Sequence, residues 1–499
     1  MPVAKQIKVS PSEKRRRIDA AALALFTTQG FHGTNNREIA KRAGVSAAAI
    51  YTHYASKEAI FDELIETHRR LVGDWLRKTV SALKDPLSKH DLTALASAIC
   101  TKMHDDPEYF QLIFIDVVEF ESRRSQAFFH DVPKWFQHLL GPLLDKVKEQ
   151  PDWCGQDPAF VMAAIYMYFI HYGLIEQHMG GRQHMGVPSE VAIERVIDLL
   201  SGGLWRLPPN AVPGSHPDRA RHSAADRKRL DEAADDRIDF IRLLSCRMWN
   251  APPEIPGRQG RPQAGHPTPK TPLMVLPQIA RQQPDDTQLR IEAAALELFT
   301  TQGFHGTNMR DIARKADVAL GAIYTYYASK EILFEQLVAI YRGCVMAFLR
   351  YVVMMVEDPF SLDGLRLLAK SIRSIVYDDA QYWLLLFIDI LEFENRHFVD
   401  IYHDMPAWLG HFARPYFEKT KQQPGWCGLD PAFAFATIYL LFFAHFIVER
   451  HMQGDRHLGV SEDEAIERLI DLVSSGFWRR PPLPASPMVS PRRRSARPA

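Results

Sequence analysis

The chain has 499 residues, room for roughly two or three domains, and its 46% hydrophobic and 24% charged residues are typical of a soluble globular protein. Its 60 Lys and Arg balance its 60 Asp and Glu, so net charge does not indicate a nucleic-acid binder, and any such function must depend on local basic patches. Five Cys without a CxxC pair argue against a disulfide framework and a cysteine zinc site, and they fit a reducing cytoplasm.

The N-terminus is charged, and no apolar stretch follows it, so a signal peptide is not expected. The most apolar runs, Ala159–Leu174 and Ala432–Val448, are interrupted by His171 and His445 and have polar ends. We therefore expect both runs to be buried helices of a globular core.

An internal duplication organises the chain. Arg17 begins RIDAAALALFTTQGFHGTN and Arg290 begins RIEAAALELFTTQGFHGTN, so the two copies are offset by 273 positions (290 − 17). No gap is needed over about 190 residues, and 32 of 45 positions are identical between Arg17–Phe61 and Arg290–Phe334. Each copy is long enough to hold a core of its own.

The duplication and the changes in composition divide the chain into segments. We expect a basic arm at 1–16, a first short-helix domain at 17–62, a first larger helical domain at 63–206, a linker at 207–284, a second short-helix domain at 285–335, a second larger helical domain at 336–480 and a basic, disordered tail at 481–499. The linker is rich in Pro and Gly at both ends, and the spacing of apolar residues between those ends favours one short helix.

Inside each copy, apolar residues recur every three or four positions and strand-like alternation is absent, which predicts an all-α fold. In the first copy, Ile18 and Leu25 belong to one stripe of a helix that Gly30 is expected to end. Thr34 is expected to cap a second helix over 35–43.

A tight turn and a short helix follow. Gly44 permits the turn because glycine tolerates a left-handed conformation. Ser46 is expected to cap a helix over Ala47–His53, and Ser56 to cap the longer helix after it.

The run REIAKRAGVSAAAIYTHYASKEAIF, from Arg37 to Phe61, resembles the N-terminal DNA-binding domain of TetR/AcrR-family regulators. It has the I-A-x-x-A-G-V-S turn, a short helix ending in Y-x-x-[FY] and then S-K-E-x-[LI], and the upstream A-A-x-x-L-F-x-x-x-G-[FY]-x-x-T pattern covers Ala20 to Thr34. The match covers some 45 residues and occurs twice, so the resemblance implies two helix-turn-helix units, each followed by a helical regulatory bundle.

The resemblance also implies which residues contact DNA. Positions that match Thr34, Tyr51 and Lys57 contact the backbone, and base-facing positions match Ala47, Ala48, Thr52 and His53. Short side chains allow a close approach to the major groove but offer only methyl contacts to thymine, so we expect modest direct readout. The full expected set is Thr34, Arg37, Ser46, Ala47, Ala48, Tyr51, Thr52, His53 and Lys57 in the first copy, and Thr307, Arg310, Leu320, Gly321, Tyr324, Thr325, Tyr326 and Lys330 in the second.

The roles of Tyr54 and of the basic N-terminal arm are left open by the sequence. Ile50 is expected in the domain core, whereas the spacing leaves Tyr54 open between the core and a phosphate contact. The basic arm either adds phosphate or minor-groove contacts or is only a solvated tail; its cations are Lys5, Lys8, Lys14, Arg15 and Arg16.

The second copy departs from the pattern. Asp317 stands where the first copy has Gly44, and Ala319 stands where it has Ser46. Asp tolerates the turn better than most residues, so the fold should survive, but losing the Ser cap costs about 1 kcal/mol. An acidic group near phosphates is unfavourable, so we expect the second helix-turn-helix to be functional but different or weaker.

In TetR-like proteins the C-terminal helices form a ligand cavity, and the last two form a dimer interface. The matching segments here are Asp157–Gly180 with Val187–Leu204, and Asp430–Gly454 with Ser461–Phe477. A fused tandem could make this dimer within one chain, as a pseudo-dimer, although pairing between separate chains stays open.

The helices Tyr109–Arg123 and Tyr382–Arg396 carry aromatic residues that suit an apolar effector pocket, and the same pattern suits plain core. The pocket residues that we expect are Phe110, Phe114, Trp383 and Phe387.

No metal and no cofactor are expected. Asp116, Glu119 and His130, with their equivalents Asp389, Glu392 and His403, resemble a metal or cation site, but Glu119 and Arg123 are four apart and could simply pair on a helix surface. His178 with His184 and His451 with His457 also suggest a metal, but the intervening sequence fits no zinc signature.

These observations predict a sequence-specific DNA-binding regulator in the cytoplasm, a ligand-responsive repressor whose partners are double-stranded DNA and a small apolar effector. The alternative is a DNA-binding architectural or interaction protein without an effector, and activation instead of repression stays open. No phosphate loop, nucleophile elbow or paired-carboxylate signature indicates an enzyme.

Overall fold

The computed structural model describes residues 11–130, 132–179, 184–203, 286–355, 358–378, 380–398, 405–452 and 456–476. Across these ranges the regular secondary structure is helical and contains no strand, which confirms the predicted all-α fold. The linker at 207–284, the tail at 481–499 and His403 lie outside the described residues.

The two copies have the same order of helices. The first unit contains α1 (Pro11–Gly33), α2 (Asn36–Ala43), α3 (Ala47–His53), α4 (Lys57–Val80), α5 (Lys89–Asp105), α6 (Pro107–Phe120), a 3₁₀ turn (Gln126–Phe128), α7 (Val132–Lys148), α8 (Pro158–His178) and α9 (Ser189–Gly202). The second contains α11 (Asp286–Gly306), α12 (Met309–Lys315), α13 (Leu320–Tyr326), α14 (Lys330–Met355), α15 (Leu362–Asp378), α16 (Ala380–Glu392), α18 (Met405–Lys421), α19 (Pro431–His451) and α20 (Glu462–Ser475).

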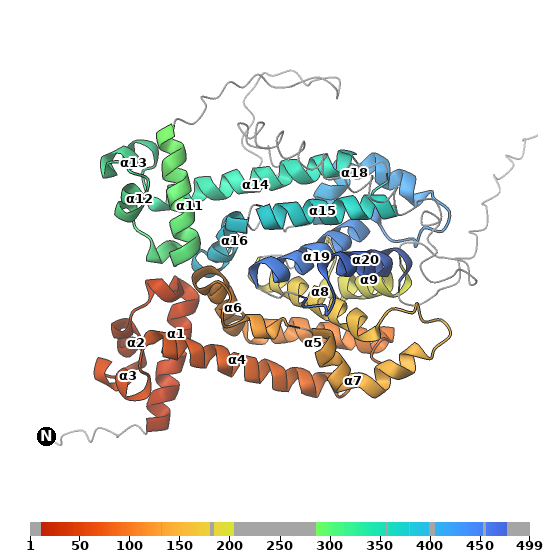
Figure 1. The fold of residues 1–499 in the computed structure, drawn as a ribbon, viewed down its shortest axis with the longest axis horizontal. Coiled ribbons are helices and arrows are strands. Elements are labelled where there is room, and N and C mark those ends of the chain that lie inside the picture. The colour runs from red at the N-terminus through yellow and green to blue at the C-terminus, as the bar shows by residue number, and fades with distance from the viewer. Residues whose placement is uncertain are drawn as a thin grey trace, which may run out of the picture.

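The two units pack against each other within the one chain (Figure 1). The small domains, α1–α3 and α11–α13, lie at the same end of the molecule, and the larger bundles lie at the other end. Contacts between units join α1 to α11, α6 to α16, α8 to α19 and α9 to α20. The pairing of like with like gives the chain an approximate internal two-fold symmetry.

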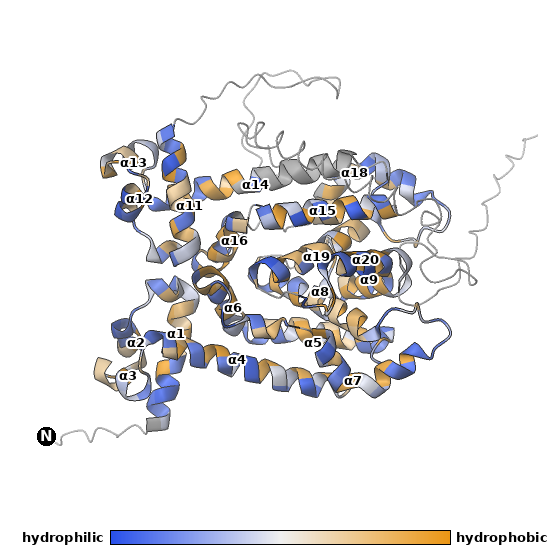
Figure 2. Cartoon of the chain, viewed as in Figure 1, coloured by the Kyte–Doolittle hydropathy of each residue, from blue (hydrophilic) through white to orange (hydrophobic). Residues whose placement is uncertain are grey.

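The helices α8 and α19 form the centre of this packing, and Figure 2 shows apolar residues along both. Each is long and apolar enough to cross a membrane, yet the most apolar stretches are 89% buried in α8 and 100% buried in α19. Buried core helices of this kind are apolar all round, as predicted for the two apolar runs.

A close backbone contact holds the last helices of the two units together. Gly203 ends α9 and Gly476 ends α20, with φ of 72° and 70°. A Cβ added to Gly203 would lie 2.4 Å from the carbonyl carbon of Ser475, and one added to Gly476 would lie 2.5 Å from the nitrogen of Gly203. The absence of side chains therefore allows the two chain segments to meet.

Several predicted boundaries need correction. The helix α1 begins at Pro11, so Lys14, Arg15 and Arg16 belong to a helix and not to an arm. Asn35, not Thr34, caps α2: its side chain accepts from the backbone N–H of Glu38, and the Glu38 side chain reciprocates in a capping box. The cap of α2 was misplaced by one residue because Thr34 and Asn35 are neighbours and both belong to the residue types that cap helices.

The aromatic helix α6 ends earlier than predicted, at Phe120, because Glu121 takes a positive φ of 54°. Gly30 breaks the helical geometry of α1 with φ of 70°, as predicted, although one short helical turn continues to Gly33. Ser46 caps α3 and Ser56 caps α4, which confirms both predicted starts.

Candidate nucleic-acid interface

The turn between α2 and α3 follows from its sequence. Gly44 adopts the left-handed conformation with φ of 63°, and its N–H donates to carbonyl oxygens at the end of α2. The Ser46 side chain accepts from the N–H of Ala49 and so fixes the start of α3. Ile50 is fully buried, as predicted, and anchors α3 to the domain core.

The outer face of α3 carries the predicted base-facing residues. Ala47, Ala48 and Thr52 are exposed, and His53 is partly buried at the end of the helix. The small side chains of Ala47 and Ala48 leave the backbone of α3 accessible, as a recognition helix in the major groove requires.

Tyr51 is the most prominent side chain of this face, with 60% of its surface exposed. Its hydroxyl accepts from Asn36 Nδ2 at 3.2 Å, so α2 helps to position it. Arg37, one residue further along α2, is also exposed. Asn36 was missed by the sequence reasoning, and its place on the helix that precedes Tyr51 was the only available signal.

Two side chains that were predicted to contact phosphates point inward in the structure. Thr34 is 1% exposed, and its hydroxyl donates to the Gly30 carbonyl at 2.8 Å. Lys57 donates through Nζ to the carbonyls of Phe31 and Thr34, both at 2.7 Å, and Nζ lies 4.0 Å from the centroid of the Phe31 ring. In this conformation both side chains stabilise the end of α1.

Tyr54 belongs to the core. It is 6% exposed, its hydroxyl bonds to the Asp19 carboxylate, and Arg15 Nε donates to that hydroxyl at 3.1 Å. Burial and the Asp19 contact raise the pKa of Tyr54 well above its ordinary value. Between the two roles left open by the sequence, the structure assigns it the internal one.

The second domain repeats this frame with a different surface. Asp317 adopts a positive φ of 53° in the turn, as predicted, and Ala319 gives α13 no side-chain cap. Thr307 is buried and donates to the Gly303 carbonyl, while Lys330 repeats the inward contacts of Lys57. The remaining predicted residues lie on the outer surface, exposed at Arg310, Gly321, Tyr324, Thr325 and Tyr326 and partly buried at Leu320.

A buried carboxylate connects each larger bundle to its DNA-binding domain. Glu119, near the end of α6, accepts from the backbone N–H groups of Phe31 at 2.7 Å and His32 at 2.6 Å. Burial is the main cause that raises the pKa of Glu119 to about 8, and the Glu392 carboxylate contributes to the same shift. The prediction that Glu119 pairs with Arg123 is wrong, because Glu119 faces inward and Arg123 pairs with Glu121 at 3.2 Å.

The second unit repeats the connection. Glu392 accepts from the N–H groups of Phe304 at 2.8 Å and His305 at 2.6 Å, and burial raises its pKa to about 7. A Cβ on Gly30 would lie 3.7 Å from Glu392 Oε1, so the carboxylates of both units converge where α1 meets α11. One sequence signal could have identified these residues: both copies keep a Glu near the end of an otherwise apolar helix.

A second buried carboxylate of α6 has a local role. Asp116 is fully buried and accepts from the N–H groups of Arg124 at 3.0 Å and Ser125 at 2.7 Å. It therefore fixes the turn after α6. His130, its suggested partner, is exposed.

A small cavity that opens to solvent lies in the first unit. Its lining comes mainly from α4, α6 and α8 and includes the predicted Phe110 and Phe114, with Met452 contributed by the second unit. The equivalent Trp383 and Phe387 do not line it: Phe387 stacks on Phe114 with ring centroids 5.0 Å apart, and Trp383 Nε1 donates to the Ile375 carbonyl.

Two imidazoles stand among these apolar groups. Burial lowers the pKa of both His68 and His171 to about 4, so both are neutral near pH 7. His171 Nδ1 lies 2.9 Å from the Met167 carbonyl, which makes Nδ1 the donor and leaves Nε2 as a hydrogen-bond acceptor.

Comparison with known proteins identifies the same units. The model of the family described as "Bacterial regulatory proteins, tetR family" matches twice, over residues 18–64 and 291–337. The uncharacterized HTH-type transcriptional regulator YvkB of Bacillus subtilis is 25% identical over 200 residues, which is 38% of this chain and 96% of that protein.

Two further relatives match over shorter stretches. The HTH-type transcriptional regulator AcrR of Shigella flexneri is 38% identical over 87 residues, 17% of this chain and 40% of that protein. The HTH-type transcriptional repressor KstR2 of Mycobacterium tuberculosis is 32% identical over 97 residues, 19% of this chain and 46% of that protein. The tetR-family unit therefore occurs twice in the chain, which is a DNA-binding transcriptional regulator.

Proposed function

We propose that the protein is a ligand-responsive repressor whose two units act as a pseudo-dimer and place α3 and α13 on one operator. The observation that supports this most directly is the packing of the two units, helix against equivalent helix, within a single chain. In two-fold symmetric regulators the recognition helices enter the major groove about 34–36 Å apart, one turn of DNA. Because α3 and α13 differ in sequence, the two half-sites should differ as well.

The proposed partners are double-stranded DNA and a small apolar effector, and the proposed location is the cytoplasm, without enzymatic activity. Regulators of this family are generally soluble and non-enzymatic. The cavity in the first unit favours an apolar molecule that carries a hydrogen-bond donor, because His171 Nε2 offers an acceptor in a mostly apolar lining.

The route from effector to DNA would run along α6. Phe110 and Phe114 of this helix line the cavity. Glu119, near the end of the helix, accepts a hydrogen bond from the backbone of α1. A ligand that shifts α6 would therefore shift α1 and, with it, the orientation of α3.

The first experiment measures how many chains bind one operator. Light scattering of the chain with DNA enriched from a random pool should show a single chain on a two-part, imperfectly symmetric site. Two chains on a palindrome would contradict the pseudo-dimer, and the absence of any enriched sequence would contradict sequence-specific regulation.

A glycine substitution tests the packing of the units. Gly203→Ala places a Cβ against the backbone of the second unit, whereas Gly155→Ala adds the same strain at φ of 88° with no atom within 4 Å. We expect Gly203→Ala to weaken operator binding at least about tenfold and Gly155→Ala to leave it unchanged. Equal losses of operator affinity in the two variants would show that DNA binding does not depend on the packing of the units.

A cavity-filling substitution tests the effector route without a known effector. Ile170→Trp on α8 adds bulk inside the cavity, and Leu71→Trp on α4 adds the same bulk at a position that is 45% exposed. If α6 connects the cavity to DNA, only Ile170→Trp should lower operator affinity while the protein stays folded by circular dichroism. Unchanged affinity in a folded Ile170→Trp protein would rule out this route.

A further inference from the structure

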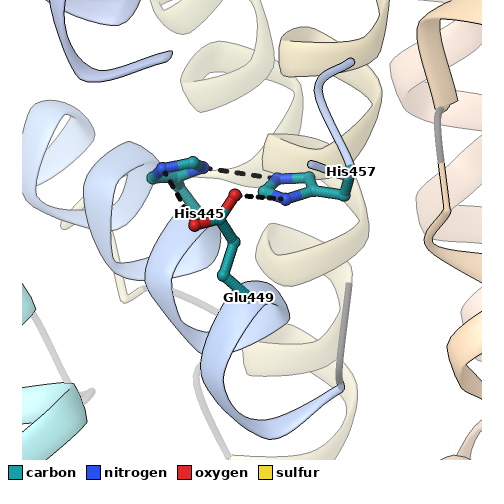
Figure 3. Close-up of side chains that lie close together, drawn as sticks. All are labelled: His445, Glu449 and His457. Carbon is teal, nitrogen blue, oxygen red and sulfur yellow. Dashed lines mark hydrogen bonds and ion pairs between the residues drawn. The ribbon is translucent and has the colours of Figure 1, made fainter. Parts of the chain in front are cut away.

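Three potential metal ligands meet in the interior of the second unit (Figure 3). His445 and Glu449 lie one turn apart on α19, and His457 belongs to the segment that leads to α20. All three are buried: the exposed fractions are 2% for His445, 8% for Glu449 and 0% for His457.

Their ligating atoms converge. His445 Nδ1 lies 3.4 Å from His457 Nε2, and His457 Nδ1 lies 3.5 Å from Glu449 Oε1. One ligand atom can be chosen from each residue so that all three lie within 4.8 Å of one another. Two nitrogens at about 2.0–2.1 Å from a tetrahedral zinc ion are about 3.3 Å apart, so the two imidazoles already have suitable spacing.

The cluster also contains a polar atom that the protein does not satisfy. His445 Nε2 is buried and has no hydrogen-bond partner; the closest carboxylate oxygen, Glu449 Oε2, is 3.9 Å away, so Nε2 is an alternative to Nδ1 as the ligand atom of His445. A buried polar group left unsatisfied costs about 1–3 kcal/mol, and such a group in a native structure often marks an ion or a functional site.

The first unit shows what the same positions look like as ordinary core. With the offset of 273 residues, the equivalents of His445, Glu449 and His457 are Tyr172, Glu176 and His184. Tyr172 donates to Glu176 Oε1 at 3.0 Å, its ring lies 4.6 Å from the His184 ring, and the Ser189 hydroxyl bonds to the same carboxylate. Two positions of this cluster differ in the second unit, where His445 replaces Tyr172 and Glu462 replaces Ser189, and the hydrogen-bonded core cluster becomes a set of three potential ligands.

We propose that His445, Glu449 and His457 bind one divalent transition-metal ion of the zinc type. Imidazole and carboxylate ligands suit Zn²⁺ and Co²⁺, and three protein ligands leave a fourth position for water or another small ligand. The proposal departs from the sequence expectation that no metal is bound, for which His451 and His457 were considered together and set aside. The structure instead brings His457 to His445, and the His451 ring lies 6.1 Å from Phe387.

The site would stabilise a contact between the units. The His457 carbonyl accepts from the N–H of Val132, at the start of α7 in the first unit, at 2.9 Å. Met452, between Glu449 and His457 in sequence, lines the cavity of the first unit. An ion that fixes His457 to α19 would therefore also fix the segment that contacts the first unit and borders its cavity.

The test is a Zn²⁺ titration of the full chain, stripped of metal with a chelator, in competition with a chromophoric chelator. His445→Tyr installs the residue that the first unit already accommodates, and Glu176→Gln, at the position equivalent to Glu449, is the matched control. We expect His445→Tyr to lose one zinc site, with affinity reduced at least about 100-fold, and Glu176→Gln to keep it. Equal stoichiometry and affinity in the wild type and His445→Tyr would overturn the proposal.

A second readout separates ligand loss from misfolding. Co²⁺ should give the visible absorption of a low-coordinate His and carboxylate site in the wild type and in Glu176→Gln, but not in His445→Tyr or Glu449→Gln. Zn²⁺ should also raise the melting temperature of the wild type by a few degrees and leave that of His445→Tyr unchanged. If Zn²⁺ raised both melting temperatures equally, the stabilising ion would bind elsewhere and the proposal would fail.

Discussion

The two DNA-binding domains, α1–α3 and α11–α13, have nearly the same interior and different surfaces. Lys57 Nζ lies 2.7 Å from two carbonyl oxygens at the end of α1, and Lys330 Nζ lies 2.7 and 2.8 Å from the equivalent oxygens of α11. Glu119 and Glu392 likewise accept hydrogen bonds from equivalent backbone N–H groups. The inward contacts have therefore been kept through the divergence of the two copies.

The outward faces are kept only in part. Tyr51 receives a hydrogen bond from Asn36, whereas the equivalent of Asn36 near Tyr324 is Met309. Ser46 caps α3, and α13 begins without a side-chain cap. Changes concentrated on the exposed face of the recognition helices are expected if each domain contacts a different DNA sequence on the same scaffold.

The largest expected effect tests whether the two interiors are equivalent. Lys57→Met and Lys330→Met each remove two charge-assisted hydrogen bonds to backbone carbonyls at the ends of α1 and α11. We expect each to lower the free energy of unfolding by about 3 kcal/mol, measured by urea denaturation. Losses that differ by more than about 1 kcal/mol would show that the two interiors are not equivalent.

The pH dependence of stability tests the paired carboxylates. In the folded state the pKa is raised from the ordinary 4.5 to about 8 for Glu119 and about 7 for Glu392. The folded protein then binds more protons than the unfolded chain between these values, so this contribution to stability is full below pH 4.5 and is lost as pH rises toward 8. Relative to the Glu119→Gln/Glu392→Gln variant, the wild type should lose stability progressively between pH 5 and 8. Parallel pH profiles for the two proteins would contradict the raised pKa values.

An exchange of recognition residues tests the difference between the surfaces. Ala47→Leu with Ala48→Gly gives α3 the residues that α13 has at 320 and 321. We expect affinity for the half-site of the first domain to fall about tenfold while the other half-site is unaffected, because one altered base contact costs about 1–3 kcal/mol. Selection of DNA from a random pool measures this, and equal changes in both half-sites would point to dimers of chains.

The smallest expected effect concerns the helix caps. Ser46→Ala should lower the free energy of unfolding by about 1 kcal/mol, because the N–H of Ala49 loses its acceptor. The reciprocal Ala319→Ser should raise it by a similar amount at α13. Thermal denaturation of both variants checks whether the cap alone explains this part of the difference; an Ala319→Ser protein without added stability would mean that the backbone before α13 cannot present the cap.

The sequence alone determined the duplication, the helices of each unit and the turn between α2 and α3. These features depend on neighbours a few residues apart: Gly44 can adopt a positive φ, and Ser46 reaches the N–H three residues ahead. Asp317 in the equivalent turn was predictable for the same reason.

Only the tertiary structure decided which exposed-looking residues face inward and what they contact. Glu119 meets an N–H group 88 residues earlier in the chain, His445 meets His457 across a loop, and Gly203 meets Gly476 of the other unit. Helical spacing places a side chain on a face, but the partner of that face depends on how whole helices pack, and packing is not encoded in local spacing.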